Sequence, residues 1–266
     1  MSLEKKQIAR QFSRAASSYD EVAQLQIRMA QRLMEKIPAQ AIGSLVDLGC
    51  GTGHALAAIQ AKTQLNLIGI DLAVGMIEQA RHRFLAGDAI RLLVADLVTT
   101  GLPNHSVDWV FSNAALQWTD SRTAFAEIRR ILKPGGQLLF STFGPQTLHE
   151  WKTAWQAIGD SFTRVHEFES HSELSSRLVA AGFNDIEVGL QYVTTNFQSV
   201  DEMLASIKLL GATNASHQRA TGLLGRAKYQ RLKDHFDCRL RDQGHLTLMF
   251  ECLFALARSP DELNTI

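Results

Sequence analysis

A regular alternation of strand-like and helix-like segments is the feature of this chain that most restricts its fold. The strand-like segments are short and rich in Val, Ile, Leu and Phe, and segments with helical periodicity separate them. We expect five such strands, at residues 44–49, 65–71, 90–96, 107–114 and 137–143. Strands that alternate with helices through short connections favour a parallel sheet with helices on both faces. The sequence therefore predicts a doubly wound α/β sheet.

The flanking segments extend this sheet. Helical spacing of apolar residues over 5–36 predicts an N-terminal helical segment, and a helix over 121–132 should end at "KPGG", because Pro and Gly cannot continue it. We expect mostly helix over 145–183 and over 200–240, with strands at 185–197 and 245–258. The prediction is one domain with a mostly parallel, seven-stranded sheet. Its parts are a helical lid (1–40), a core (41–143) and a second half (144–266) with a helical insertion at about 198–242.

Composition excludes several classes of protein. The 266 residues include 27 Lys and Arg and 27 Asp and Glu, so the formal net charge is zero and nothing points to nucleic acid or an anionic membrane. The chain has no run of about 18 apolar residues that could span a membrane, and its N-terminus lacks the apolar segment of a secretory signal. Cys50, Cys238 and Cys252 are too scattered for a disulfide framework or a metal site. We expect a cytoplasmic protein.

A glycine-rich loop follows the first predicted strand. In "VDLGCGTGH", residues 46–54, Gly49, Gly51 and Gly53 permit a tight turn and a close approach of a ligand to the backbone at the start of a helix. A dinucleotide fingerprint requires a third glycine where this chain has His54. The loop therefore predicts a cofactor site of another kind.

Polar side chains also follow the next three predicted strands: Asp71, Asp96 and Asn113. Ligands of open α/β sheets bind beyond the carboxyl ends of the strands, so these residues and the glycine loop should form one site. An acid at the position of Asp71 also occurs in nicotinamide sites, so Asp71 does not discriminate between cofactors by itself.

Taken together, residues 40–143 resemble the class I S-adenosylmethionine-dependent methyltransferases, which have a Rossmann-like fold. The resemblance implies that the loop binds the methionine end of S-adenosyl-L-methionine, that Asp47 orients the cofactor amine and that Asp71 binds the ribose. It places Leu72 and Met76 beside the adenine, with Asp96 and the Leu97 amide at its amino group. The implied cofactor-binding set is Asp47, Gly49, Cys50, Gly51, Gly53, Asp71, Leu72, Met76, Asp96, Leu97 and Asn113, and the implied product is S-adenosyl-L-homocysteine.

The methyl acceptor is indicated more weakly. No His–Asp pair or pair of acids stands out as a general base, which favours an acceptor that is already anionic, such as a carboxylate with a pKa near 4. "FSNAALQW", residues 111–118, is similar to small-molecule carboxyl methyltransferases of the trans-aconitate type. We expect Gln117, Trp118 and Phe143 on the acceptor side, although Trp118 could instead be a core aromatic residue.

Four segments that lie wholly or mostly outside that core are similar to the malonyl-acyl carrier protein O-methyltransferases of biotin synthesis. They are "QFSRAASSYDEVAQLQ" (11–26), "TFGPQTLHEW" (142–151), "SIKLLGATNA" (206–215) and "GLLGRAKYQRL" (222–232). Residues 155–200 match less closely. The resemblance implies methylation of the free carboxylate of a malonyl thioester, carried by an acidic protein.

Two residues are our candidates for the catalytic site. Lys208 is a single basic residue in an apolar helical run, and we hypothesise that it pairs with the malonyl carboxylate while Tyr19 orients that group or the cofactor. The alternative for Lys208 is a surface residue whose stem covers apolar neighbours.

Charge is distributed unevenly along the chain. Residues 203–258 contain nine Lys or Arg and four Asp or Glu. This excess fits either a solvated helix or a face that docks the carrier protein with Arg226, Lys228 and Arg231. Other open readings are a methyltransferase for a free carboxylate or a quinone, and a methyltransferase-like assembly factor of respiratory complexes.

Overall fold

The computed structural model describes residues 3–84, 90–159, 167–209 and 226–261, apart from some side chains in the N-terminal turn and in the last two helices. The chain forms two compact units. The first comprises Met1–Phe143, Glu169–Leu190 and Leu253–Ile266, and the second comprises Gly144–Phe168 and Gln191–Cys252. The single-domain organisation expected from the sequence stays a prediction.

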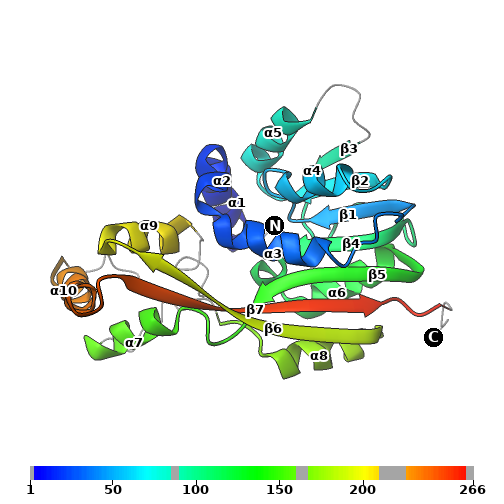
Figure 1. The fold of residues 1–266 in the computed structure, drawn as a ribbon. Helices are drawn as coiled ribbons and strands as arrows, with labels where there is room; N and C mark the ends of the chain where they lie inside the picture. The colour runs from blue at the N-terminus through cyan, green and yellow to red at the C-terminus, as the bar shows by residue number, and fades with distance from the viewer. Residues whose placement is uncertain (1–2, 85–89, 160–166, 210–225, 262–266) are drawn as a thin grey trace. The chain divides into compact units, whose positions relative to one another are not determined.

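Seven strands among the described residues form one sheet in the order β3-β2-β1-β4-β5-β7-β6 (Figure 1). They are β1 (Ser44–Leu48), β2 (Asn66–Asp71), β3 (Ile90–Val94), β4 (Val107–Asn113), β5 (Leu132–Phe143), β6 (Asn184–Phe197) and β7 (Leu246–Arg258). The pairs β1–β2, β1–β4, β2–β3 and β4–β5 are parallel. The predicted doubly wound, mostly parallel sheet is therefore confirmed.

The start of β5 differs from the prediction. The strand begins at Leu132 and includes "KPGG", whereas we expected it to begin at residue 137. Val107 pairs with Leu132 and Trp109 pairs with Gln137, so the extra residues of β5 bulge between two paired positions. The helix ends at residue 131, one residue before its predicted end, and a bulge can accommodate Pro and Gly inside a strand without ending its pairing.

The predicted N-terminal helix is divided into short helices. They are α1 (Leu3–Ala15), a 3-10 turn (Ala16–Ser18), α2 (Tyr19–Val22) and α3 (Gln24–Met34). The Ser18 hydroxyl donates to the Ala15 carbonyl at 3.4 Å, and serine side chains of this kind compete with helical backbone bonds. The division places Tyr19 at the beginning of a new helix.

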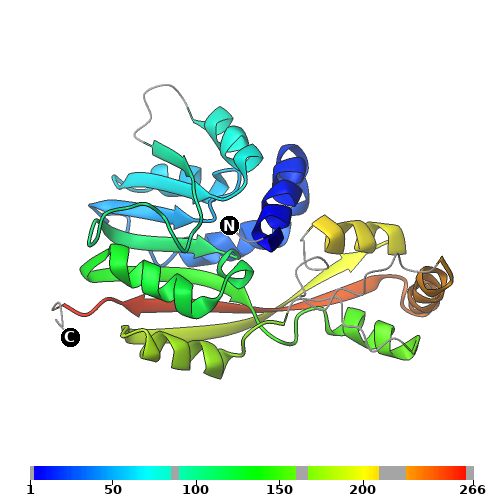
Figure 2. The same ribbon diagram turned by 180° about the vertical axis from the view of Figure 1, so that it is seen from behind.

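Helices cover both faces of the sheet. The remaining helices of the first unit are α4 (His54–Gln60), α5 (Val74–Arg83), a 3-10 turn (Leu116–Trp118), α6 (Ser121–Ile131) and α8 (His171–Ala180). Figure 1 shows α3 and α4 on one face, and Figure 2 shows α6 and α8 on the other. A buried cluster that includes Val110, Phe125 and Phe140 joins α6 and α8 to the central strands. This packing fixes the strand ends at which ligands of such sheets bind.

The second unit contains α7 (His149–Ala157), α9 (Val200–Leu209) and α10 (Arg226–Gln243), with parts of β6 and β7. The Trp151 ring stacks on the Phe236 ring, with 5.9 Å between ring centroids, and this contact joins α7 to α10. The buried Glu251 carboxylate accepts from the Gln146 amide at 2.6 Å and so holds the start of the "GPQT" loop.

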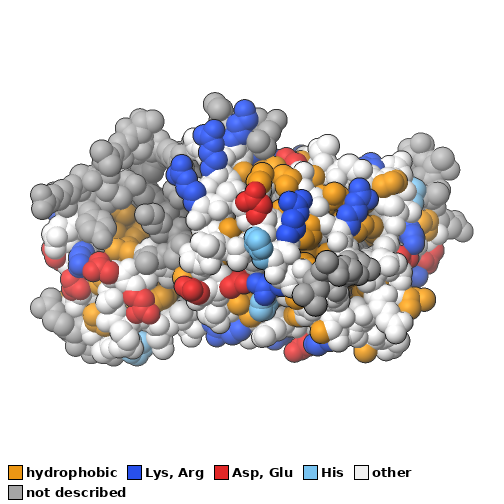
Figure 3. Space-filling model, turned by 90° about the horizontal axis from the view of Figure 1, so that it is seen from above, with side chains coloured by type: hydrophobic (Ala, Val, Ile, Leu, Met, Phe, Trp, Pro, Cys, Tyr) orange, Lys and Arg blue, Asp and Glu red, His pale blue; other side chains and the backbone are white. Residues whose placement is uncertain are grey.

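Basic and acidic side chains intermingle on the face shown in Figure 3, as expected for a chain without net charge. No described helix combines the length and the hydropathy that a membrane span requires.

A buried carboxylate holds the connection that follows β3. Glu127 of α6 accepts from the Thr100 amide at 2.8 Å and from the Thr100 hydroxyl at 2.6 Å, and it pairs with Arg130. The hydrogen bonds from Arg130 and Thr100 outweigh desolvation and lower the pKa of Glu127 to about 2. Because that pKa lies below the ordinary value, the interaction stabilises the fold above about pH 4.5 and is lost as pH falls towards 2.

We predict that Glu127→Gln destabilises the protein by about 2 kcal/mol at pH 7, since charged hydrogen bonds are lost. The difference in the free energy of unfolding between the variant and the parent chain should shrink as pH falls below about 4.5. Urea unfolding across this range measures both quantities, with Glu78→Gln on the exposed face of α5 as the control. A difference that stays constant with pH would contradict the assignment.

Candidate active site

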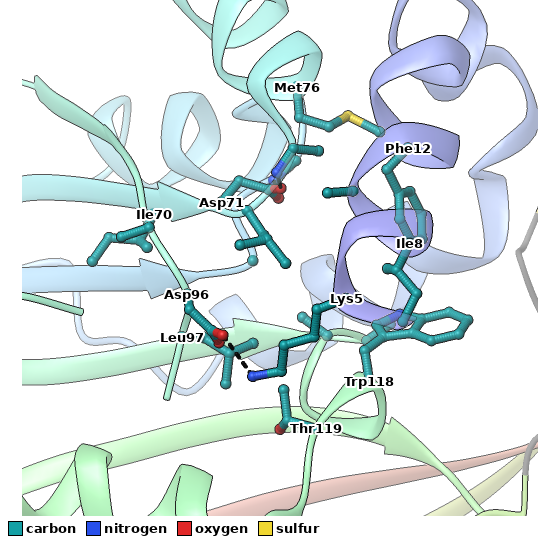
Figure 4. Close-up of a pocket in the computed structure, with 18 of the residues that line it drawn as sticks. Lys5, Ile8, Phe12, Ile70, Asp71, Met76, Asp96, Leu97, Trp118 and Thr119 are labelled. Carbon is teal, nitrogen blue, oxygen red and sulfur yellow. Dashed lines mark hydrogen bonds and ion pairs between the residues drawn. The ribbon is translucent and has the colours of Figure 1, made fainter. Parts of the chain in front are cut away.

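A cavity lies at the carboxyl ends of β2, β3 and β4, where the sequence placed the site (Figure 4). One face of α1 forms its outer wall, through Lys5, Ile8, Ala9 and Phe12. Spacings of three and four residues put these side chains on the same side of a helix. The lining is largely apolar, with Asp71 and Asp96 as its charged groups on the sheet side.

A second cavity lies beneath α2 and α3, over the glycine loop. Its lining includes Asp20, Gln26 and Asp47. The two cavities share Tyr19, Gly49, Gly51 and Asn113 as lining residues. Together they provide a polar end and an apolar end on either side of the glycine loop.

The glycine loop has the turn geometry that its glycines predict. Gly49, Gly51 and Gly53 all have positive φ angles, between 53° and 79°. A side chain at Gly49 would collide with Ala115, whereas a Cβ at Gly51 would meet nothing within 4 Å. Gly53 lines neither cavity and is the N-cap residue of α4, where the ring of Phe84 lies against it. Gly51 therefore leaves open space at the site itself.

Asp71 supports the loop from the end of β2. Its carboxylate accepts from the Gly51 amide at 2.9 Å and from the Ala73 amide at 2.8 Å. Burial raises the pKa of Asp71, and these backbone bonds partly offset the effect. A carboxylate oxygen has further lone pairs, so Asp71 can still accept from a ligand hydroxyl.

Asp47 is the most perturbed carboxyl of the site. It is buried at the end of β1, and its Oδ1 atom has no hydrogen-bond partner among the described residues. Burial, and then the charge of Asp71, raises the pKa of Asp47 to about 8. The group is therefore mostly neutral at pH 7 in the free protein, and a cation beside it would favour its ionised form.

Asp96 has a partner that the sequence did not suggest. Lys5 Nζ lies 2.6 Å from its Oδ2 atom, and the Val98 amide donates to Oδ1 at 3.2 Å (Figure 4). Both groups are partly buried. The amino group of an adenine at Asp96 would therefore either share a carboxylate oxygen with Lys5 or take the place of Lys5 at that oxygen.

A second polar connection joins α2 to the glycine loop. Asp20 accepts from the Thr52 hydroxyl at 2.6 Å and forms an ion pair with Arg83, and Arg83 Nε donates to the Thr52 carbonyl at 2.9 Å. These contacts hold the neighbouring Tyr19 at the junction of the two cavities. The Tyr19 ring lies edge-to-face against Phe12, with 6.2 Å between ring centroids.

The state of the Tyr19 phenol limits what it can do. Burial, and then the charges of Asp71 and Asp20, raises its pKa further above the ordinary value. The hydroxyl therefore stays protonated at neutral pH, which suits a hydrogen-bond donor and not a base.

Most of the predicted site residues line the cavities. Leu72, Met76, Leu97 and Trp118 lie in the first cavity, and Asn113 lies in both. Cys50 lies in the second cavity, and burial, with smaller contributions from Asp47 and Asp71, raises the pKa of its thiol.

Three predicted residues lie elsewhere or only partly within the described structure. Gln117 lines neither cavity, and its amide donates to the Ala114 carbonyl at 2.7 Å. Phe143 is buried at the end of β5 and also lines neither cavity. Lys208 belongs to α9 in the second unit, but its side chain lies outside the described residues. The roles of all three stay predictions.

The N-terminal segment contributes residues that the sequence analysis missed: Lys5, Ile8, Phe12, Asp20 and Gln26. A signal for some of them was present. Lys5, Ile8 and Phe12 share a helical face, and Gln26 is a polar residue beside the apolar stripe of Leu25 and Met29. Their contacts with strand ends far along the chain carry no such signal.

The arrangement fits S-adenosylmethionine. Asp47 offers an unpaired acceptor for the amine, Gly51 leaves open space beside the backbone, and the apolar lining around Met76 and Leu97 suits an aromatic ring. No group of three or more potential metal ligands occurs among the described residues.

We predict that Asp47→Asn changes how stability depends on pH. The folded-state pKa of about 8 exceeds the unfolded value of about 4, so ionising Asp47 destabilises the native state progressively from about pH 4 to pH 8. Asparagine has no such titration. Melting temperatures measured between pH 5 and 8 should therefore rise for the variant relative to the parent chain, while binding of S-adenosylhomocysteine weakens. Parallel pH profiles would exclude a neutral Asp47 in the free protein.

Known proteins similar to this chain have consistent names. The model of the methyltransferase domain family matches residues 46–140. A malonyl-acyl carrier protein O-methyltransferase of Methylovorus sp. (strain MP688) is 34% identical, and the match covers 97% of this chain and 90% of that protein. The protein of the same name from Halorhodospira halophila is also 34% identical, with 96% and 88% covered.

Solved structures agree on the fold. A putative methyltransferase complexed with the Trm112 activator of Haloferax volcanii has a TM-score of 0.59 at 22% identity, with 94% of this chain and 97% of that chain covered. A phosphoethanolamine N-methyltransferase of Haemonchus contortus, solved with S-adenosyl-L-methionine, has a TM-score of 0.57 at 19% identity, with 93% and 57% covered. With the cavity at the strand ends and the near full-length sequence matches, these findings confirm the predicted enzyme class. The chain belongs to the malonyl-acyl carrier protein O-methyltransferase family, and S-adenosylmethionine is its methyl donor.

Proposed function

We propose that this enzyme methylates the free carboxylate of a malonyl thioester on acyl carrier protein, an early step of biotin synthesis. The observation that carries the proposal is the 34% identity to relatives of that name over 97% of the chain. The match extends beyond the methyltransferase domain at 46–140 and so includes the segments expected to select the acceptor.

The donor would bind across both cavities. We assign its amino acid end to Asp47 and the glycine loop, its ribose to Asp71, and its adenine to the apolar lining that includes Leu72 and Met76. S-adenosylmethionine, when bound, supplies a methyl group on a positively charged sulfur. The corresponding product is S-adenosylhomocysteine.

The acceptor needs orientation more than activation. A malonyl carboxylate is ionised at neutral pH, so no residue has to remove a proton from it. Tyr19, whose phenol is protonated and lies between the cavities, would donate a hydrogen bond to the acceptor or the donor. Phe12 and Trp118, with ring centroids 5.7 Å apart, would limit the access of water to the reacting groups.

The product explains why such a step is useful. Methylation converts a charged chain end into a neutral ester, and a charge would be costly to bury in the apolar tunnel of a fatty-acid synthase. This chemistry also agrees with a bifunctional biotin-biosynthesis protein of Saccharophagus degradans that is 32% identical to this chain, although this chain corresponds to only 46% of that protein's length.

For the carrier protein we propose a docking face on the basic C-terminal region. Arg231 is exposed on α10, and Lys233 of the same helix pairs with Asp201 at 3.1 Å. Arg226 and Lys228 belong to α10, but their side chains lie outside the described residues. Carrier proteins are acidic, so complementary charge would accelerate their association.

A comparison of acceptors tests the proposed function. Methyl transfer should be fastest with malonyl-acyl carrier protein, slower with malonyl-CoA and negligible with trans-aconitate. Higher salt should raise the KM for the carrier protein more than the KM for malonyl-CoA, because it screens the charges of the docking face. Transfer to trans-aconitate alone would replace the proposal with the free-carboxylate alternative, and no transfer to any acceptor would favour a non-catalytic role.

Lys208 is proposed to pair with the malonyl carboxylate. Lys208→Met should lower kcat/KM for the malonyl substrate about tenfold or more, since a charge-assisted hydrogen bond is lost. Binding of S-adenosylhomocysteine should not change. The exposed Lys62, in the turn after α4, provides the control in Lys62→Met. Unchanged turnover in Lys208→Met would remove this residue from the acceptor site.

A further inference from the structure

Gln26 is an unusual residue for the inner face of α3. It is buried on a helix whose other buried residues include the apolar Leu25 and Met29, and its Oε1 atom has no hydrogen-bond partner among the described residues. A buried acceptor without a partner is costly, so this atom requires a partner that the described residues do not supply.

A second unpartnered acceptor lines the same cavity. Asp47 Oδ1, at the end of β1, is also buried without a hydrogen-bond partner among the described residues. Gln26 reaches this cavity from the N-terminal segment, whereas Asp47 reaches it from the sheet. Two acceptors from opposite sides indicate a ligand group that carries several donor hydrogens.

The backbone around them favours a cation over an anion. The Gly49 and Cys50 amides both donate to the Ile70 carbonyl, at 2.7 Å and 3.0 Å, and the Gly51 amide donates to Asp71. These three loop amides are therefore already engaged, which leaves this part of the cavity rich in acceptors. An ammonium group supplies three donors for these acceptors, whereas a carboxylate would bring only further acceptors.

The position of Gln26 is fixed from the sheet. Its backbone carbonyl accepts from Asn113 Nδ2 at 3.0 Å, and Asn113 Oδ1 accepts from the Ser141 hydroxyl at 2.7 Å. The chain of contacts joins α3 to the ends of β4 and β5. These contacts hold the backbone of Gln26 beside the cavity that its side chain lines.

We propose that Gln26 and Asp47 together bind the ammonium group of the methyl donor. The N-terminal segment then recognises the donor directly, in addition to covering it. The inference deepens the proposed function on its donor side and does not depend on which acceptor is methylated.

Three ligands distinguish which group of the methyl donor Gln26 contacts. S-adenosylhomocysteine carries both the ammonium and the carboxylate, its decarboxylated analogue carries only the ammonium, and 5′-methylthioadenosine carries neither. Calorimetry on the full-length protein should show that Gln26→Met raises the Kd of the first two ligands about tenfold or more, since each loses a hydrogen bond to a charged group. The Kd of methylthioadenosine should stay within about twofold of the parent value.

The controls distinguish recognition from folding. Gln31→Met makes the same chemical change on an exposed position of α3 and should leave all three values unchanged. Retained binding of methylthioadenosine shows that the Gln26 variant is folded. Gln26→Glu, which keeps the shape and adds negative charge, should preserve or tighten binding of the decarboxylated analogue.

Several outcomes would overturn the inference. Equal weakening of all three ligands would make Gln26 a structural residue, and weakening of S-adenosylhomocysteine alone would assign it to the carboxylate. No change in any ligand would exclude a contact. These measurements contain no acceptor, so their failure is distinct from a failure of the acceptor comparison, which tests the proposed function.

Discussion

The site depends on how the end of β2 holds the loop that follows β1. The Ile70 carbonyl accepts from two successive loop amides, and Asp71 accepts from a third. These bonds exist because β1 and β2 pair in parallel with Leu48 opposite Ile70, so both strands end at the same level. The loop is thus shaped by the neighbouring strand, and the positive φ angles of its glycines allow it to adopt that shape without steric cost.

Placing two acids at this point has an electrostatic cost. Asp47 is buried and Asp71 is partly buried, and each has a raised pKa. Asp71 recovers part of the cost through backbone donors, whereas Asp47 has none among the described residues. The difference separates their functions: Asp71 supports the loop, and Asp47 remains available to a positively charged group. The acceptor-rich cavity is consistent with this division.

The sequence predicted the sheet well, and it predicted which strand-end residues line the cavities, because both follow from local patterns. Strand periodicity located β1 to β4 within a few residues, and residues such as Asp71 were placed by the rule that parallel strands end together. The start of β5 was predicted wrongly, because a bulge across from Val107 and Trp109 depends on a neighbouring strand that is not visible in local periodicity. Lys5 and Gln26 were missed for a similar reason, since their partners Asp96 and Asn113 lie about 90 residues away in the chain.

Polar contacts across the cavities help to attach the N-terminal segment to the sheet side, in addition to buried apolar residues such as Leu25 and Met29 of α3. Lys5 pairs with Asp96, Asp20 binds Thr52, and the Gln26 carbonyl accepts from Asn113. A ligand that fills the space between these walls adds contacts to both, so it stabilises the attached state in proportion to its concentration relative to its Kd. The susceptibility of α1 to α3 to proteases would then depend on the supply of methyl donor. Donor supply would in this way set both the activity of the enzyme and its resistance to local unfolding.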